Sequence, residues 1–217
     1  MTAPAFSFRP VLFKALAAFL GPLLALPISS ALAWSKWSAG EMLLNLITFP
    51  AILALVLCLP GFMGGLALLF WPRFRRRGLT LSVVCFAFVL GTLGGIRLMQ
   101  PVERQGWLRV IAQAEPLVAA IHAHERRHGT APERLEEMVP TELAAMPTTG
   151  LGSSPEFRYQ KADGTTRVFG DRWALTVRPP GLMLGFDTLF YVPSETYPEE
   201  GAGGGIERIG RWAYLRN

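Results

Sequence analysis

One short segment of the sequence has the residue types and spacing of a zinc protease. Residues 124–128 read His-Glu-Arg-Arg-His, which matches the H-E-x-x-H pattern. In such enzymes two histidines one helical turn apart bind the metal, the glutamate between them acts as general base, and a third ligand comes from elsewhere in the chain. On this interpretation His124 and His128 bind zinc, Glu125 is the base, and the protein hydrolyses peptides.

The surroundings of the motif favour a different interpretation. Gly129 follows directly and is expected to end the helix, so the second histidine lies in the last turn. The helix dipole favours cationic side chains there, which accounts for Arg126, Arg127 and His128 without a metal. A motif without its structural context is only a hypothesis. We therefore expect no catalytic residue, no metal and no cofactor, and keep the zinc metallopeptidase as the alternative.

The third ligand is the open point of that alternative. No histidine follows His128 in the chain, and His122 lies about 200° from His124 around a helix, so it cannot complete the same site. The acidic residues that remain open as ligands, none of them in a recognisable second motif, are Glu136, Glu137 and Glu142.

The elements that must position these residues begin with three apolar segments. They span about residues 11–34, 43–71 and 79–99, and each reaches the roughly 20 residues that a helix needs to cross a bilayer. Pro50 and Pro60 are expected to kink the second segment or to move its start toward Phe49. The first segment ends in Ala-Leu-Ala, like a signal-peptidase site, but its length favours retention as a membrane helix over cleavage.

The distribution of charge predicts the orientation. The loop PRFRRRG at residues 72–78 carries four arginines, which is typical of a cytoplasmic loop. The N-terminus is then inside, and residues 101–217 form an extracytoplasmic domain at a bacterial cytoplasmic (inner) membrane. Residues 1–99 hold eight Lys and Arg against one Glu, a net +7, whereas residues 100–217 hold thirteen against fifteen acidic residues, a net −2. The basic charge thus belongs to the membrane-flanking segments, and nucleic acid is not an expected partner.

Two pairs of glycines predict close packing of helices. Gly61 and Gly65 lie in the second apolar segment and Gly91 and Gly95 in the third, each pair four residues apart. Glycines at this spacing line one face of a helix and let another backbone approach. We expect these two helices to pack on each other, or the pairs to form a contact between copies of the chain.

The polar half predicts a helix followed by strands. Apolar residues recur at steps of three and four from Trp107 to Ile121, with Pro116 either kinking the helix or beginning a second one. A short helix is expected at APERLEEMV, with Leu135, Met138 and Val139 facing inward. Strands are expected at residues 157–160, 167–170, 173–178, 188–192 and 208–215. A helix followed by a small antiparallel sheet is an α+β fold.

The residues from Ile121 to Gln160, IHAHERRHGTAPERLEEMVPTELAAMPTTGLGSSPEFRYQ, resemble the soluble domain of type II secretion pseudopilins and type IV pilin-like proteins. The resemblance covers about residues 105–160 and rests on His128, Gly129, Pro132, Leu135, Met138, Pro140, Leu143, Pro147, Gly150, Phe157 and Tyr159. It implies an extended helix packed across a sheet, outside the cytoplasmic membrane.

These observations together predict a non-enzymatic membrane protein. Its outward domain is expected to be an interaction or assembly module of the cell envelope. The expected partners are the lipid bilayer and either another copy of the chain or another envelope protein.

Overall fold

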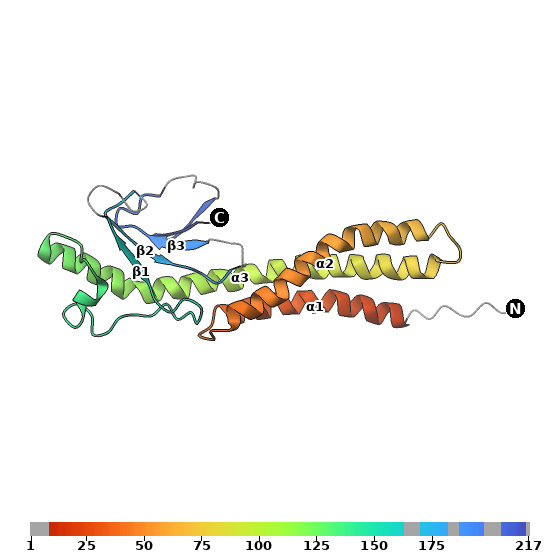
Figure 1. Ribbon diagram of the computed structural model, residues 1–217, viewed down its shortest axis with the longest axis horizontal. Coiled ribbons are helices and arrows are strands. Elements are labelled where there is room, and N and C mark those ends of the chain that lie inside the picture. The colour runs from red at the N-terminus through yellow and green to blue at the C-terminus, as the bar shows by residue number, and fades with distance from the viewer. Residues whose placement is uncertain (1–8, 163–169, 182–186, 198–204, 216–217) are drawn as a thin grey trace. The chain divides into compact units, whose positions relative to one another are not determined.

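The computed structural model describes the chain except for residues 1–8, 163–169, 182–186, 198–204 and 216–217. The described residues form three long α-helices, one short 3₁₀ helix and five strands (Figure 1). The chain divides into two compact units, Met1–Ala31 with Met42–Val102, and Leu32–Glu41 with Glu103–Asn217. The α+β class, with three long apolar helices and a small antiparallel sheet, is confirmed.

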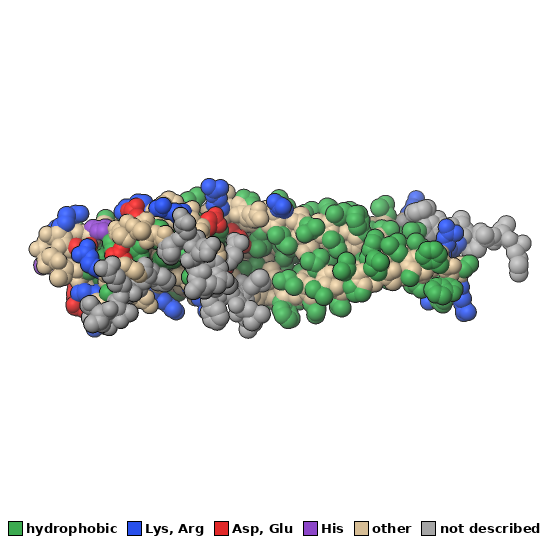
Figure 2. Space-filling model, turned by 90° about the horizontal axis from the view of Figure 1, so that it is seen from above, with side chains coloured by type: hydrophobic (Ala, Val, Ile, Leu, Met, Phe, Trp, Pro, Cys, Tyr) green, Lys and Arg blue, Asp and Glu red, His purple; other side chains and the backbone are tan. Residues whose placement is uncertain are grey.

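The first unit is built from helices of membrane-spanning length. It contains most of α1 (Arg9–Ala33), α2 (Gly40–Leu68) and the first part of α3 (Arg75–His128). All three helices are long and apolar enough to cross a membrane. On the face of this unit that Figure 2 shows, hydrophobic side chains predominate and cationic ones are confined to its ends. Many large apolar side chains point outward from the unit, as expected of a surface that contacts lipid.

Prolines do not divide these helices where the sequence pattern suggested. The second helix begins at Gly40 and continues through Pro50 and Pro60, so its start is not moved to Phe49. The third does not end near residue 99 but runs through Pro101 and Pro116 to His128. The predicted separation into a membrane helix and a following helix is therefore wrong.

Burial explains why α3 continues through Pro116. An interior proline costs a helix about 3 kcal/mol. Around it, however, the apolar stripe is buried, and each large aliphatic side chain contributes roughly 1.5–3 kcal/mol when removed from water. The free energy gained by burying the stripe therefore exceeds the cost of one proline. Its buried members around Pro116 are Val110, Ala114, Leu117, Val118 and Ile121.

The four glycines contact two different helices. A Cβ added to Gly65 of α2 would lie 2.9 Å from the carbonyl oxygen of Gly78 in α3, and one on Gly61 would lie 3.2 Å from the sulfur of Cys85. By contrast, a Cβ on Gly95 of α3 would lie 2.5 Å from the carbonyl oxygen of Pro22 in α1. Gly91 faces the carbonyl of Phe19, also in α1. The first pair thus faces α3, whereas the second pair faces α1 instead of α2.

Gly65 offers a matched test of the contact between α2 and α3. Replacing it by valine is expected to destabilise the protein by about 1–3 kcal/mol, because the side chain would overlap the backbone of α3. Gly64→Val is the control, since nothing lies within 4 Å of the added Cβ at that position. The thermal midpoint of the detergent-extracted protein should fall in the first variant and stay close to wild type in the second. Equal midpoints for the two variants would contradict this packing.

The second unit contains an antiparallel sheet. Its strands are β1 (Arg158–Lys161), β2 (Trp173–Val177), β3 (Thr188–Tyr191), β4 (Ile206–Ile209) and β5 (Trp212–Leu215), in the order β1-β2-β3-β5-β4. The predicted strands at 157–160, 173–178 and 188–192 are confirmed within a residue or two. The predicted strand at 167–170 lies, except for its last residue, outside the described residues.

The prediction of one continuous strand at 208–215 is wrong. This segment belongs to a hairpin, in which β4 pairs with β5 and Ile209 stands opposite Trp212. The turn between them contains Gly210 at φ 64°, a backbone conformation that glycine adopts at little cost. The chain reverses there, so half of the predicted strand forms the edge of the sheet.

The core of the second unit lies between α3 and one face of the sheet. The predicted stripe on α3 is confirmed: its side chains are buried except for Ile111, which is partly buried. Alternate residues of the central strands complete the core, namely Trp173, Leu175, Val177, Leu189, Tyr191, Trp212 and Tyr214. Among the described residues, the other face of the sheet holds a smaller buried cluster of Ala174, Phe190, Val192 and Ala213.

A 3₁₀ helix, η1 (Leu135–Met138), follows α3 and stands where the short helix was predicted. Leu135 and Met138 are buried in the core as expected. Val139 is not, because it follows the helix in an extended conformation that exposes its side chain.

Candidate metal centre and the polar network of the sheet domain

Three metal-ligating side chains meet at the end of α3. His124, His128 and Glu142 each offer one ligand atom, and these atoms all lie within 4.8 Å of one another. The two imidazoles stand one helical turn apart with ring centroids separated by 4.3 Å. Glu142 comes from the loop after η1. Of the three glutamates left open as a third ligand, the structure brings this one to the histidines.

The loop after η1 presents Glu142 in a defined position. The buried side chain of Met138 anchors the chain just before this loop. The backbone carbonyl of Met138 accepts hydrogen bonds from the N–H groups of Glu142 (2.8 Å) and Leu143 (3.0 Å). The Glu142 side chain is only 3% exposed. A buried carboxylate needs a partner of opposite charge or several hydrogen-bond donors.

Glu142 has one direct partner among the described residues. Nη1 of Arg127 donates to its Oε1 at 3.0 Å, from a side chain that is 58% exposed. His124 Nδ1 lies 4.0 Å from the same oxygen, too far for a hydrogen bond. This nitrogen is buried and has no hydrogen-bond partner among the described residues. Such atoms are uncommon, since buried polar groups are nearly always hydrogen-bonded.

The glutamate of the HERRH motif has other partners. Oε2 of Glu125 lies 3.3 Å from Nδ1 of His122, and Oε1 lies 3.8 Å from Nη2 of Arg172. It is not part of the group formed by His124, His128 and Glu142. The contacts of Glu125 are therefore with His122 of α3 and with Arg172 next to β2, and not with the three ligand atoms.

The two other open glutamates also have separate contacts. Glu136 lies 3.7 Å from Arg134 in an exposed ion pair. Glu137 accepts a hydrogen bond of 3.2 Å from the N–H of Glu133.

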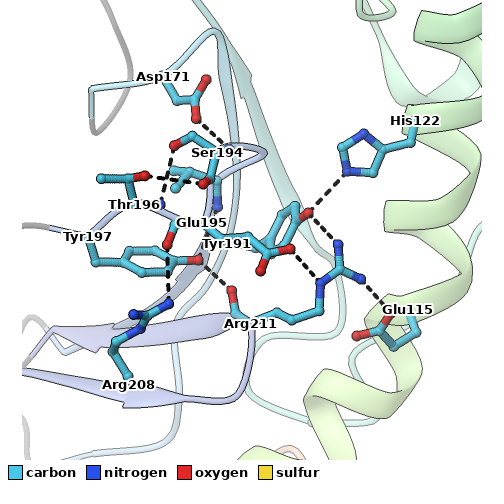
Figure 3. A network of polar contacts seen from close by, with 11 residues as sticks. Glu115, His122, Asp171, Tyr191, Ser194, Glu195, Thr196, Tyr197, Arg208 and Arg211 are labelled. Atoms are coloured by element: carbon cyan, nitrogen blue, oxygen red, sulfur yellow. Dashed lines mark hydrogen bonds and ion pairs between the residues drawn. The ribbon is translucent and has the colours of Figure 1, made fainter.

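A polar network joins α3 to the central strand β3 and to the turn between β4 and β5 (Figure 3). Nε2 of His122 lies 3.0 Å from the hydroxyl of Tyr191 in β3, which also accepts a hydrogen bond of 2.9 Å from Nη2 of Arg211. Nε of Arg211 donates to Glu195 at 2.6 Å, and its Nη1 lies 3.6 Å from Glu115 of α3. The ring of His122 thus stands between the carboxylate of Glu125 on one side and the phenol of Tyr191 on the other.

The phenol of Tyr191 takes part in this network as a neutral group. Burial raises the pKa of Tyr191, against the opposing charge of Arg211. A raised pKa keeps the phenol neutral near pH 7, so it acts as a hydrogen-bonding group and not as a nucleophile or base. The arrangement of Glu125, His122 and Tyr191 can therefore hold the helix and the sheet in register.

Sequence reasoning did not single out this network. His122 was excluded from the zinc motif by its direction, and its partner Tyr191 is 69 residues further along the chain. Arg211 was part of a predicted strand without an assigned role. No local pattern signals such pairs, because only the packing of the sheet on α3 brings them together.

Comparison with known protein families, with curated proteins and with solved structures finds no match to this chain. The class that the fold defines is an α+β chain with three helices that are long and apolar enough to cross a membrane. Its sheet domain is built on the last of those helices.

Proposed function

We propose that this chain is an integral protein of a bacterial cytoplasmic membrane, and that its residues from Glu103 onward form a pilin-like domain outside that membrane. The domain acts by binding another envelope protein or another copy of the chain, and not by catalysis. One observation carries the proposal: the boundary between the two units falls inside α3. The helix that supplies the third apolar segment also supplies the buried stripe of the sheet domain.

The order of the elements supports the pilin-like part of the proposal. A long helix is followed by an irregular segment with η1, and then by an antiparallel sheet that covers the second half of the helix. The sequence resemblance over residues 105–160 implies the same order. Four arginines, Arg73 before α3 and Arg75, Arg76 and Arg77 in its first turn, support an orientation with this end of the helix inside and the sheet domain outside.

The contacts of the charged groups support a binding role over a catalytic one. Glu125 and His122 are paired with each other and with Arg172 and Tyr191. Groups held in this way stabilise the domain, whereas a general base must be within reach of a substrate proton.

A photo-crosslinking experiment tests the binding role. Leu108 is a large apolar side chain of α3 that is 51% exposed, whereas Trp107 and Val110 of the adjacent stripe are buried. In the membranes of living cells, a photoreactive amino acid at position 108 should give a discrete product in which the chain is crosslinked to a second copy or to another envelope protein. The same probe at exposed Glu136, in η1, is the control and should give less of that product. If neither site gives a specific product, and further exposed positions of the domain give none, the proposed binding role is contradicted.

A second candidate function, the zinc metallopeptidase, is favoured by the position of Glu142 beside His124 and His128. This function requires Glu125 to leave His122 and act as base. It predicts that the zinc-loaded protein hydrolyses peptides and that Glu125→Gln abolishes hydrolysis while zinc stays bound. The binding role predicts no hydrolysis in either protein.

A further inference from the structure

The group of His124, His128 and Glu142 has no part in the binding role proposed above. We propose that these three side chains bind one zinc ion, which joins the last turn of α3 to the loop after η1. The ion is structural and not catalytic. This inference does not rest on the proposed function, since it concerns how the end of the helix is held.

The ligand set matches the chemistry of zinc. Two imidazole nitrogens and one carboxylate oxygen form a common zinc-binding set, and histidines four residues apart on a helix present both rings to the same side. Zinc bonds of about 2.0–2.2 Å place neighbouring ligand atoms roughly 3.4 Å apart in a tetrahedron. The ligand atoms here lie within 4.8 Å of one another, so side-chain rotations of about 1 Å bring them to that spacing. His128 is exposed, so its side chain is less restricted in rotation than a buried one.

The local electrostatics also favour a cation. Glu142 is a buried carboxylate, and His124 Nδ1 is a buried nitrogen without a hydrogen-bond partner among the described residues. A metal ion between them satisfies both groups, because it neutralises the carboxylate and uses the nitrogen lone pair. The site lies in the last turn of a 54-residue helix, where the unpaired carbonyls favour positive charge.

Arg127 is the competitor for this site. Its guanidinium donates to the carboxylate oxygen that the metal would use, yet its side chain is more than half exposed. Because most of the arginine side chain is already in solvent, it can turn away when a metal ion takes over the neutralisation of the buried carboxylate. Removing the arginine leaves the ligands in place and takes away a competing charge.

The direction of Glu125 makes the ion structural. The contacts of this glutamate are with His122 and Arg172, so in the described part of the chain the base of the motif is engaged away from the three ligand atoms. Three protein ligands leave one position for water. The ion then connects residues 124 and 128 of α3 with residue 142, across the segment that contains η1.

The experiment measures zinc in the full-length protein, extracted in detergent with an affinity tag that contains no histidine. After dialysis against buffer with micromolar free zinc, we expect one zinc per chain by mass spectrometry. His124→Ala, His128→Ala and Glu142→Gln should each lower the affinity at least about tenfold. Arg127→Gln should bind zinc as tightly as wild type or more tightly. His122→Gln is the matched control, because it removes a histidine from the same helix without touching the site.

Two further readouts keep the proposal testable if a variant folds poorly. Zinc at about 100 times its Kd should raise the thermal midpoint of the wild type by roughly 5–10 °C, and by much less in the ligand variants. Cobalt(II) in place of zinc should give the visible absorption of a four-coordinate site. Less than one zinc per chain in the wild type, six-coordinate cobalt, or equal loss in His122→Gln and the ligand variants would each overturn the proposal.

Discussion

Replacing Leu117 by alanine should destabilise the sheet domain by about 2–5 kcal/mol. Leu117 lies in the middle of the α3 stripe and is 0% exposed, so truncation leaves a cavity between the helix and the sheet. A loss of this size is a large part of the roughly 5–15 kcal/mol by which domains are stable. The free energy of unfolding can be measured in detergent by denaturant titration, with the fluorescence of buried Trp173 and Trp212 as the signal.

Leu108 provides the matched control for this prediction. It is a leucine of the same helix, nine positions earlier, and is 51% exposed. Leu108→Ala should therefore change the free energy of unfolding by no more than about 0.5 kcal/mol. Similar losses of stability in the two alanine variants would contradict the packing of α3 on the sheet through the stripe that contains Leu117.

The largest effect on the whole protein is expected from the four arginines just before α3 and in its first turn. A C-terminal alkaline phosphatase fusion should be active and a C-terminal green fluorescent protein fusion dark, because the proposed orientation puts the sheet domain outside. Exchanging Arg73, Arg75, Arg76 and Arg77 for glutamine, with four lysines added near Ser35, should reverse which reporter works. The reversal follows because cationic loops are retained on the cytoplasmic side.

A charge-conserving variant separates orientation from other effects of these arginines. Exchange of the same four residues for lysine should leave both reporters as in the wild type, since the orientation signal is positive charge and not the guanidinium group. A fluorescent and phosphatase-negative fusion of the unaltered chain would contradict the orientation, and with it the envelope role.

A zinc ion and a binding role are compatible in one domain. The proposed ion would hold the end of α3 and the following loop, while the exposed side of the helix around Leu108 remains available. Loss of zinc in the ligand variants without loss of the crosslinked product would assign the ion to local stability alone. Loss of both together would place the partner's contact near the end of the helix.

Local patterns in the sequence were sufficient for much of the fold. The three apolar helices, the stripe from Trp107 to Ile121 and three of the strands follow from hydropathy and periodicity, because each depends on residues close together in the chain. Boundaries were less predictable. Pro116 favours a break locally, and only burial of the residues on both sides of it decides that the helix continues.

The candidate site shows the same division between local and tertiary information. The spacing of His124 and His128 was evident from the sequence, because a helix alone brings them to one side. The choice of Glu142 over Glu136 and Glu137 was not, since all three are acidic residues within one short segment. The turn that follows Met138 decides it by directing one carboxylate back to the helix.

Glu125 has one local partner, His122 three residues earlier on α3, and one that only the tertiary structure supplies, Arg172. Its spacing in the motif predicts a base beside a metal, whereas the packed domain directs it to His122 and Arg172. His122 is in turn held by Tyr191, which is 69 residues away in the chain. The sequence by itself determined which residues share a helix face. Packing of the sheet decided which of them meet a partner, because contacts between distant segments exist only once those segments are packed together.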